Sequence, residues 1–131
     1  MNDKENIKGI SFNIDRFEQF GFFGVPYYIG INDEKNTVQA KFMGEERLSS
    51  ETFMFYDLIK SVIEEVQILN WEERYEDPYF RVEPSIEWEV IIHSFDGNEM
   101  RFSGKDVYPD TFFEFKELYE TAGFHYYLTK E

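Results

Sequence analysis

The sequence predicts a small α+β domain in which β-hairpins are covered by helices on one face. Two observations lead to this prediction. Alternating apolar residues mark paired strands followed by a helical pattern, and the same order of elements occurs twice along the chain. A length of 131 residues fits one domain, which buries about two thirds of its unfolded surface and needs no disulfide to fold. We therefore predict a single domain over residues 1–131.

The first half of the chain is typical of a hairpin followed by a helix. Strands are expected over residues 25–31 and 37–43, because Val38, Ala40 and Phe42 alternate with polar residues and a polar cluster lies between the two runs. A helix is expected over residues 50–69, where apolar residues recur every three or four positions. Ser49 or Ser50 is the expected N-cap of this helix.

The second half repeats this order. Strands are expected over residues 86–95 and 99–104, joined at the hairpin signal Asp96-Gly97. A three-residue loop that includes Asn98 would pair Ile92 with Phe102 and keep apolar side chains on one face. A helix is expected over residues 109–121, ending at a glycine at position 123. Residues 9–14 and 124–128 are expected to add a strand at each end.

An internal match relates the two halves at an offset of sixty residues. Phe42 and Gly44 align with Phe102 and Gly104, and the match continues into both helices. It predicts a duplicated ββα-ββα fold, with a four- or five-stranded antiparallel sheet and two helices on one face. The pseudo-repeats span about 25–69 and 86–123, and an aromatic connection covers 70–85.

The second half also contains a recognisable series of residues. It runs Trp71, Tyr75, Pro78, Trp88-Glu89-Val90-Ile91-Ile92, Asp96-Gly97, Phe102-Ser103-Gly104-Lys105-Asp106-Val107-Tyr108-Pro109, Phe112, Phe115 and Leu118. This series resembles a small domain of acidic, mostly uncharacterised proteins of Gram-positive bacteria and mobile elements. In that domain a Trp-bearing hairpin with an Asp-Gly turn leads into Gly-x-x-x-Tyr-Pro and a short helix. The resemblance covers about fifty residues and implies a fold unit rather than an activity.

The charge of the chain restricts its partners. With 27 acidic and 13 basic side chains, the net charge of −14 repels phosphate backbones and anionic membranes and attracts basic protein surfaces. We therefore expect a basic protein partner, no direct nucleic-acid binding and no membrane binding. The chain has no cysteine, and its polar N-terminus does not match a secretory signal, so a cytoplasmic location is expected.

No motif in the sequence points to catalysis or to a metal. The two histidines, His93 and His125, lack metal-ligand spacing, and Ser94 would point to the opposite strand face from His93. The calcium-loop pattern and a Gly-rich phosphate loop are both missing. We expect no catalytic residues, no metal site and no cofactor, and therefore a protein that is not an enzyme.

The densest acidic run supplies the candidate partner-binding site. Large aromatic side chains lie within this run, a composition that suits recognition of a basic protein surface. The alternative is that the aromatic side chains face the core while the carboxylates face water. The candidate residues are Glu64, Glu65, Trp71, Glu72, Glu73, Tyr75, Glu76 and Asp77.

Two classes of function fit these observations. The first is a non-enzymatic acidic protein that inhibits or neutralises a basic, nucleic-acid-handling protein, as a toxin immunity protein or as a phage inhibitor of the anti-CRISPR type that mimics DNA. The second is a small-molecule-binding or enzymatic domain with a site between the pseudo-repeats, lined by Tyr27, Tyr28, Trp88 and Tyr108. The open edges of a short antiparallel sheet also allow a homodimer.

Overall fold

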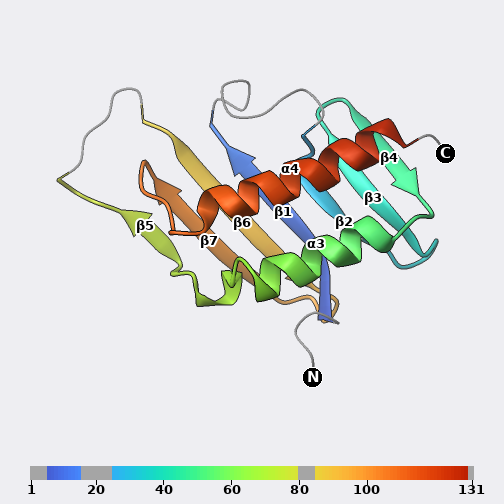
Figure 1. The fold of residues 1–131 in the computed structure, drawn as a ribbon, viewed down its shortest axis with the longest axis horizontal. Coiled ribbons are helices and arrows are strands. Elements are labelled where there is room, and N and C mark those ends of the chain that lie inside the picture. The colour runs from blue at the N-terminus through green and yellow to red at the C-terminus, as the bar shows by residue number, and fades with distance from the viewer. Residues whose placement is uncertain (1–5, 16–24, 80–84, 130–131) are drawn as a thin grey trace.

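The computed structural model describes residues 6–15, 25–79 and 85–129, which form one sheet covered by helices (Figure 1). The strands in chain order are β1 (Ile7–Ile14), β2 (Tyr28–Asn32), β3 (Thr37–Phe42), β4 (Glu45–Ser49), β5 (Arg74–Glu76), β6 (Glu87–Ser94) and β7 (Glu99–Lys105). The helices are α3 (Phe53–Glu64), the 3₁₀ turn η1 (Ile68–Asn70) and α4 (Phe112–Leu128). The α+β class expected from the sequence is confirmed.

The sheet is larger than the four or five strands expected. Its seven strands lie in the order β4-β3-β2-β1-β6-β7-β5, with β1 at the centre between the two hairpins. It is mixed rather than purely antiparallel, because β5 runs parallel to β7. Both strands that the sequence reading missed, β4 and β5, lie at the edges, where charged residues break the apolar alternation that marks the inner strands.

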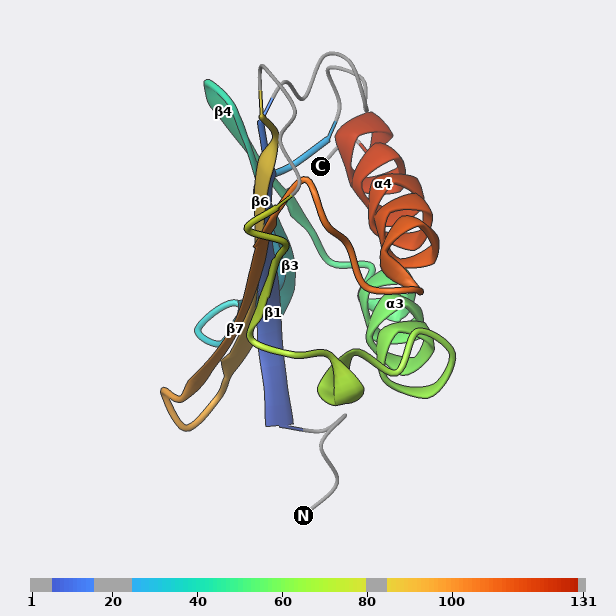
Figure 2. The same cartoon turned by 90° about the vertical axis from the view of Figure 1, so that its left-hand side faces the viewer.

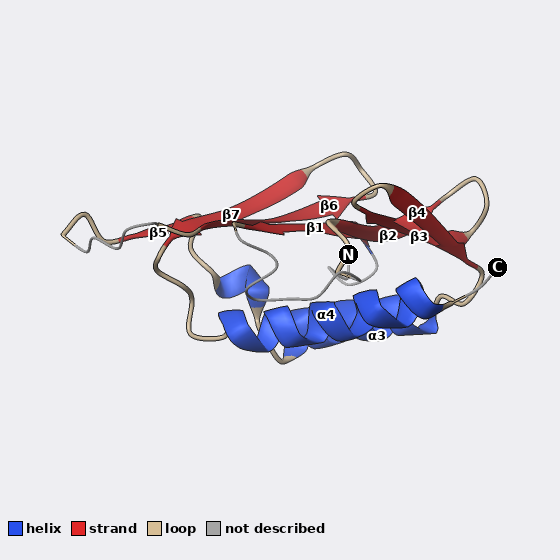
Figure 3. Cartoon of the chain, turned by 90° about the horizontal axis from the view of Figure 1, so that it is seen from above, coloured by secondary structure: helices blue, strands red, loops and turns tan. Residues whose placement is uncertain are grey.

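The domain has two layers. Helices α3 and α4 cover the same face of the sheet, and none of the described helices lies on the other face (Figures 2 and 3). The core lies between sheet and helices, where the ring of Phe12 on the central strand contacts those of Phe112, Phe115 and Tyr119 on α4 at centroid distances of 5.3 to 6.0 Å. None of the helices among the described residues is long and apolar enough to cross a membrane.

Helix α3 begins later and ends earlier than expected. It covers Phe53–Glu64 rather than 50–69, because Gln67 adopts a left-handed conformation (φ 56°) that separates it from η1. The N-cap position is Thr52, whose side chain makes no capping hydrogen bond, so the expected cap at Ser49 or Ser50 is wrong. Ser49 Oγ instead accepts a hydrogen bond from the Glu51 N–H at 3.1 Å.

Helix α4 continues past Gly123, the glycine that was expected to end it. Gly123 lies inside α4, and residues 124–128 are helical rather than a strand. The last turns are held by the core, since Tyr126 is buried and the Tyr127 ring contacts the Phe42 ring at 5.3 Å. An internal glycine costs about 1 kcal/mol of helix stability, which these contacts offset.

The β6–β7 hairpin has the expected three-residue loop, but it begins one residue earlier. Gly97 N–H donates to the Ser94 carbonyl at 3.0 Å, and Ser94 N–H donates to the Asn98 carbonyl at 2.9 Å. The loop is therefore 95–97, with Gly97 at φ 92°. The expected pairing of Ile92 with Phe102 is wrong, because Val90 lies opposite Phe102.

The duplicated ββα pattern is not seen. The first hairpin is followed by a third strand, β4, before α3, whereas β7 leads into α4 without one. The second hairpin is instead preceded by β5, which lies in the connection 70–85 that was expected to contain no strand. The matching sequence steps also differ in local geometry, since Gly44 lies in the turn between β3 and β4 at φ 82°, whereas Gly104 lies within β7.

Candidate functional site: the helix layer and the acidic edge

The acidic side chains of the predicted site are exposed at one edge of the molecule. Glu64 and Glu65 lie at the C-terminal end of α3, Glu72, Glu73 and Glu76 lie between η1 and the end of β5, and Asp77 follows β5. The cation Arg74 lies among them and binds Glu76 at 2.8 Å, so part of this negative charge is neutralised locally. The six exposed acids are Glu64, Glu65, Glu72, Glu73, Glu76 and Asp77.

Trp71, the first aromatic residue of the predicted site, is part of the core. Its side chain is 9% exposed, and its ring lies 5.7 Å from each of the Phe102 and Phe115 rings. The indole Nε1 donates to Thr111 Oγ1 at 2.9 Å, and this hydroxyl donates to the Val66 carbonyl at 2.9 Å. Trp71 therefore joins η1 to the start of α4 and is part of the core.

Tyr75, the second aromatic residue, is half-buried and committed to local contacts. Its ring lies 6.0 Å from the Trp88 ring, and its hydroxyl accepts a hydrogen bond from the Glu72 N–H at 2.8 Å. In the predicted site, the aromatic side chains thus face the core while the carboxylates face water. Aromatic side chains that can anchor a partner lie elsewhere.

Large apolar side chains are exposed on the helix layer. Phe53 on α3 is 67% exposed and Phe113 on α4 is 57% exposed. Tyr56, Phe124 and Leu128 add to this surface. Helical spacing places Phe53 on the solvent side of α3, and Phe113, Phe124 and Leu128 on that of α4. The sequence analysis did not identify these residues as a surface: Phe53 and Phe113 entered only through the internal match, and residues 124–128 were expected to form a strand.

A groove runs between α3 and α4, which lie side by side and antiparallel in Figure 1. It has a volume of about 280 Å³. Leu58, Leu118 and Ala122 supply apolar surface, and the carboxylates of Asp57, Glu114 and Glu117 line it from both helices. Met54, Ser61 and Thr121 complete the lining. The groove is therefore apolar between acidic walls.

The charge of the two helices is strongly negative on the solvent side. The acids are Asp57 and Glu64 on α3 and Glu114, Glu117 and Glu120 on α4. The lysines are Lys60, which is exposed, and Lys116, which is buried and bound to Glu120 one turn away. The helix layer thus combines exposed apolar side chains with more carboxylates than lysines.

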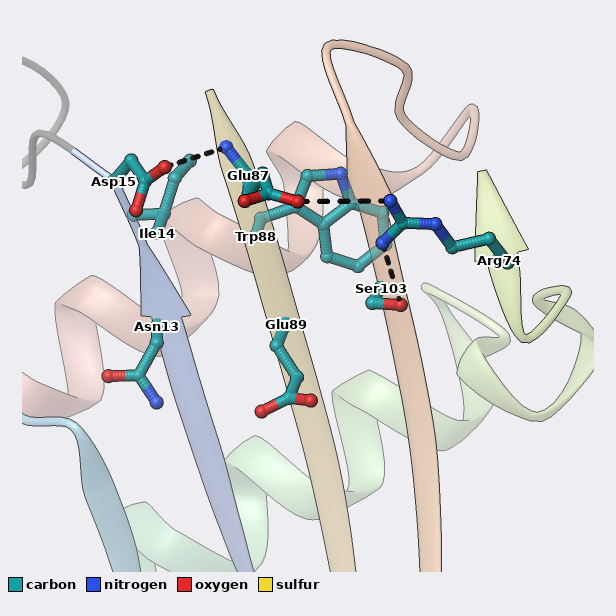
Figure 4. A pocket seen from close by; sticks show the side chains of 8 residues that line it. All are labelled: Asn13, Ile14, Asp15, Arg74, Glu87, Trp88, Glu89 and Ser103. Carbon is teal, nitrogen blue, oxygen red and sulfur yellow. Dashed lines mark hydrogen bonds and ion pairs between the residues drawn. The ribbon is translucent and has the colours of Figure 1, made fainter. Parts of the chain in front are cut away.

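The open face of the sheet carries a hollow of about 430 Å³ near the ends of β1 and β6 (Figure 4). Arg74 crosses it, with guanidinium nitrogens 3.2 Å from Ser103 Oγ and 3.9 Å from a Glu87 carboxylate oxygen. The Asp15 carboxylate accepts a hydrogen bond from the Glu87 N–H at 3.1 Å. The contacts of Arg74 thus join β5 to β7 and β6, and the Asp15–Glu87 bond joins the end of β1 to β6.

A second polar pair lies on the open face and was missed in the sequence. Ser11 Oγ lies 2.8 Å from His93 Nε2, and burial lowers the pKa of His93 below its usual value. The contact depends on the pairing of β1 with β6, which is not encoded locally. A serine nucleophile also needs an acid that orients the histidine. The acid opposite His93 in the sheet is Glu99, and its carboxylate is bound to Arg101 at 2.9 Å rather than to the histidine.

The aromatic residues considered for a site between the halves lie on different faces. Trp88 is buried on the helix side, where it stacks on Tyr108 at 6.2 Å. Tyr28 lies on the open face, with its ring over Gly9 and Gly30. Tyr28 and Trp88 are therefore on opposite sides of the sheet and do not line one cleft.

Among residues 6–15, 25–79 and 85–129, no three histidine, aspartate or glutamate side chains come together as a set that could hold a metal ion. Comparison with known proteins gives no further assignment. No family model, no curated protein and no solved structure matches the chain.

Proposed function

We propose that this chain is a non-enzymatic binding protein that neutralises a basic, nucleic-acid-handling protein through its helix layer. The observation that carries the proposal is the exposure of Phe53 and Phe113 on a surface rich in carboxylates. Exposed aromatic side chains supply the buried area that dominates binding energy, and surrounding carboxylates supply charge complementarity to a basic surface.

The charge of the whole molecule supports this assignment of partner. A net charge of −14 raises the local concentration of cationic proteins and speeds their association at low salt. A basic surface that binds nucleic acid has the complementary sign. A chain that covers such a surface blocks its phosphate contacts, which fits a toxin immunity protein and a phage inhibitor that mimics DNA equally well.

The acidic edge extends the same surface. Glu64 and Glu65 end α3, and Glu72 and Glu73 follow η1, so negative charge continues from the helix layer toward β5. In this proposal these side chains steer the encounter, while the aromatic residues of α3 and α4 make the close contact. The assignment of the acidic edge to partner binding thus remains part of the proposal.

Affinity purification with two forms of the chain tests the proposal. The wild-type chain is expected to retain a basic protein from a bacterial lysate at low salt and to release it at high salt. The double variant Phe53→Ala/Phe113→Ala is expected to retain much less of the same protein, since both side chains are more than half exposed and available to a partner.

The function of the retained protein provides the second readout. Added wild-type chain is expected to inhibit its nucleic-acid binding or cleavage, and duplex DNA is expected to compete with the chain for it. Retention of no basic protein, or retention without any inhibition, would contradict the proposal.

A further inference from the structure

We propose that the groove between α3 and α4 binds an amphipathic basic helix of the partner. This inference rests on the proposed function and specifies the part of the partner that is recognised. The occupant packs apolar side chains against the floor of the groove and places arginine or lysine side chains against its acidic walls. The complex is then a three-helix layer on the sheet.

The floor of the groove has the composition that helix packing needs. Leu58 and Leu118 are contributed by facing helices, and Ala122, which is 1% exposed, lies beside them. Leu58 is 3% exposed, so the floor is continuous with the core, while Leu118 is only partly buried. An apolar side chain inserted here would complete the burial of Leu118.

The length of the groove fits a short helix. Its lining on α3 runs from Met54 to Ser61, and on α4 from Glu114 to Ala122. At about 1.5 Å per residue, these segments are roughly 10 to 12 Å long, or two helical turns. Two turns present apolar residues at positions i, i+3, i+4 and i+7, the pattern by which helices are recognised in grooves.

The walls select the charge of the occupant. Asp57 lies on one side, and Glu114 and Glu117 lie on the other, so a helix in the groove has carboxylates along both flanks. Cationic side chains on both flanks of the bound helix complement them, whereas acidic ones are repelled. A second copy of this chain is disfavoured as the occupant, because each copy carries a net charge of −14 and its own helices are acidic.

A synthetic peptide tests the inference directly. The probe is an amphipathic peptide with leucine on one helical face and arginine along both flanks, and its control is a scrambled peptide of the same composition. Binding to the full chain is measured by fluorescence anisotropy at several salt concentrations. The wild-type chain is expected to bind the amphipathic peptide at least about ten times more tightly than the scrambled one.

Two variants that each remove two carboxylates distinguish the effect of the groove on binding from that of the overall electrostatic field. Asp57→Asn/Glu117→Gln removes two carboxylates from the groove, while Asp33→Asn/Glu34→Gln removes two from the β2–β3 turn. The groove variant is expected to weaken binding about tenfold or more, and the turn variant less than about twofold. Matching circular dichroism spectra and melting temperatures show that all forms are folded.

The outcomes distinguish this inference from the proposed function. Equal losses in both variants, or equal affinity for the two peptides, would overturn the groove assignment. If the groove variant also retains the basic protein as well as the wild type does, while Phe53→Ala/Phe113→Ala does not, the groove is not the binding surface but the proposed function stands. If the wild type retains no basic protein, the proposed function itself is wrong.

Discussion

The hydroxyl of Tyr126 on α4 caps the first turn of α3 through Phe55. It accepts a hydrogen bond from the buried Phe55 N–H at 3.0 Å and donates one to the Glu51 carbonyl at 3.0 Å. A helix leaves its first N–H groups without intrahelical partners, and Thr52 at the N-cap supplies no side-chain bond. A side chain 71 positions away in sequence thus does what a local cap usually does.

Replacement of this hydroxyl should therefore be costly. Tyr126→Phe leaves the Phe55 N–H buried without an acceptor, and we expect a loss of about 1–3 kcal/mol in the free energy of unfolding. Urea denaturation followed by circular dichroism measures it. Tyr79→Phe, at a side chain that is 93% exposed, is the control and should change stability little. Equal stability of the Tyr126→Phe variant and the wild type would show that the cap is not needed.

Ionisation of Tyr126 should lower the stability of the protein in alkali. Burial raises the pKa of Tyr126 to about 12, above its ordinary value of 10.0. A group with a raised pKa contributes stability that is complete below pH 10 and is lost as the pH rises through 12. The stability difference between the wild type and Tyr126→Phe should therefore narrow across this window, in urea titrations at several pH values. A stability difference that stays constant between pH 10 and 12 would contradict the raised pKa of Tyr126.

Gly104 is predicted to tolerate no side chain. An added Cβ would lie 2.5 Å from Trp88 Nε1 and 2.7 Å from the Val107 carbonyl oxygen, which are themselves hydrogen-bonded at 2.9 Å. We expect Gly104→Ala to cost about 1–3 kcal/mol and to change the near-ultraviolet circular dichroism of the tryptophans.

Gly44→Ala is the matched control for this substitution. Gly44 has a positive φ of 82° but open space around it, so alanine costs only backbone strain of about 1–2 kcal/mol. The tryptophan signal should be unchanged in this variant. An unchanged signal in Gly104→Ala as well would show that the sheet moves to accept the methyl group.

Substitutions of core and of surface aromatic residues should have different effects on stability and on partner binding. Trp71→Phe removes the hydrogen bond to Thr111 and part of the core, so it should lower the free energy of unfolding by about 1–3 kcal/mol without weakening the binding of the basic partner. Phe53→Ala/Phe113→Ala should weaken the binding of the basic partner while leaving the free energy of unfolding nearly unchanged. Paired denaturation and binding measurements on both variants test this, and a Trp71→Phe variant that folds but loses the partner would contradict it.

Local patterns in the sequence were enough to predict most of the strands and one face of α3. Alternation located the strands of both hairpins and the central strand β1, and Asp96-Gly97 located a turn. The exposure of the carboxylates of the candidate site agrees with the alternative in which they face water. These features depend on residues close in sequence, and the folded chain contains them where the local pattern predicts them.

Features that depend on distant residues were not predictable in this way. The cap of α3 comes from α4, and the helix continues through Gly123 because Tyr126 and Tyr127 are held by the core. Trp71 and Tyr75 looked equally suited to a partner surface or to the core, and contacts with Trp88 and Phe102 decided for the core.

The sequence by itself determined the class of the fold, the paired hairpins and the net charge of −14. The tertiary structure decided the strand order around β1, the seven-stranded size of the sheet and the exposure of Phe53 and Phe113 on the helix layer. The physical reason is one of magnitude. A local signal such as a cap or an internal glycine is worth about 1 kcal/mol, whereas burial of a large side chain contributes about 1.5–3 kcal/mol and depends on its partners across the core.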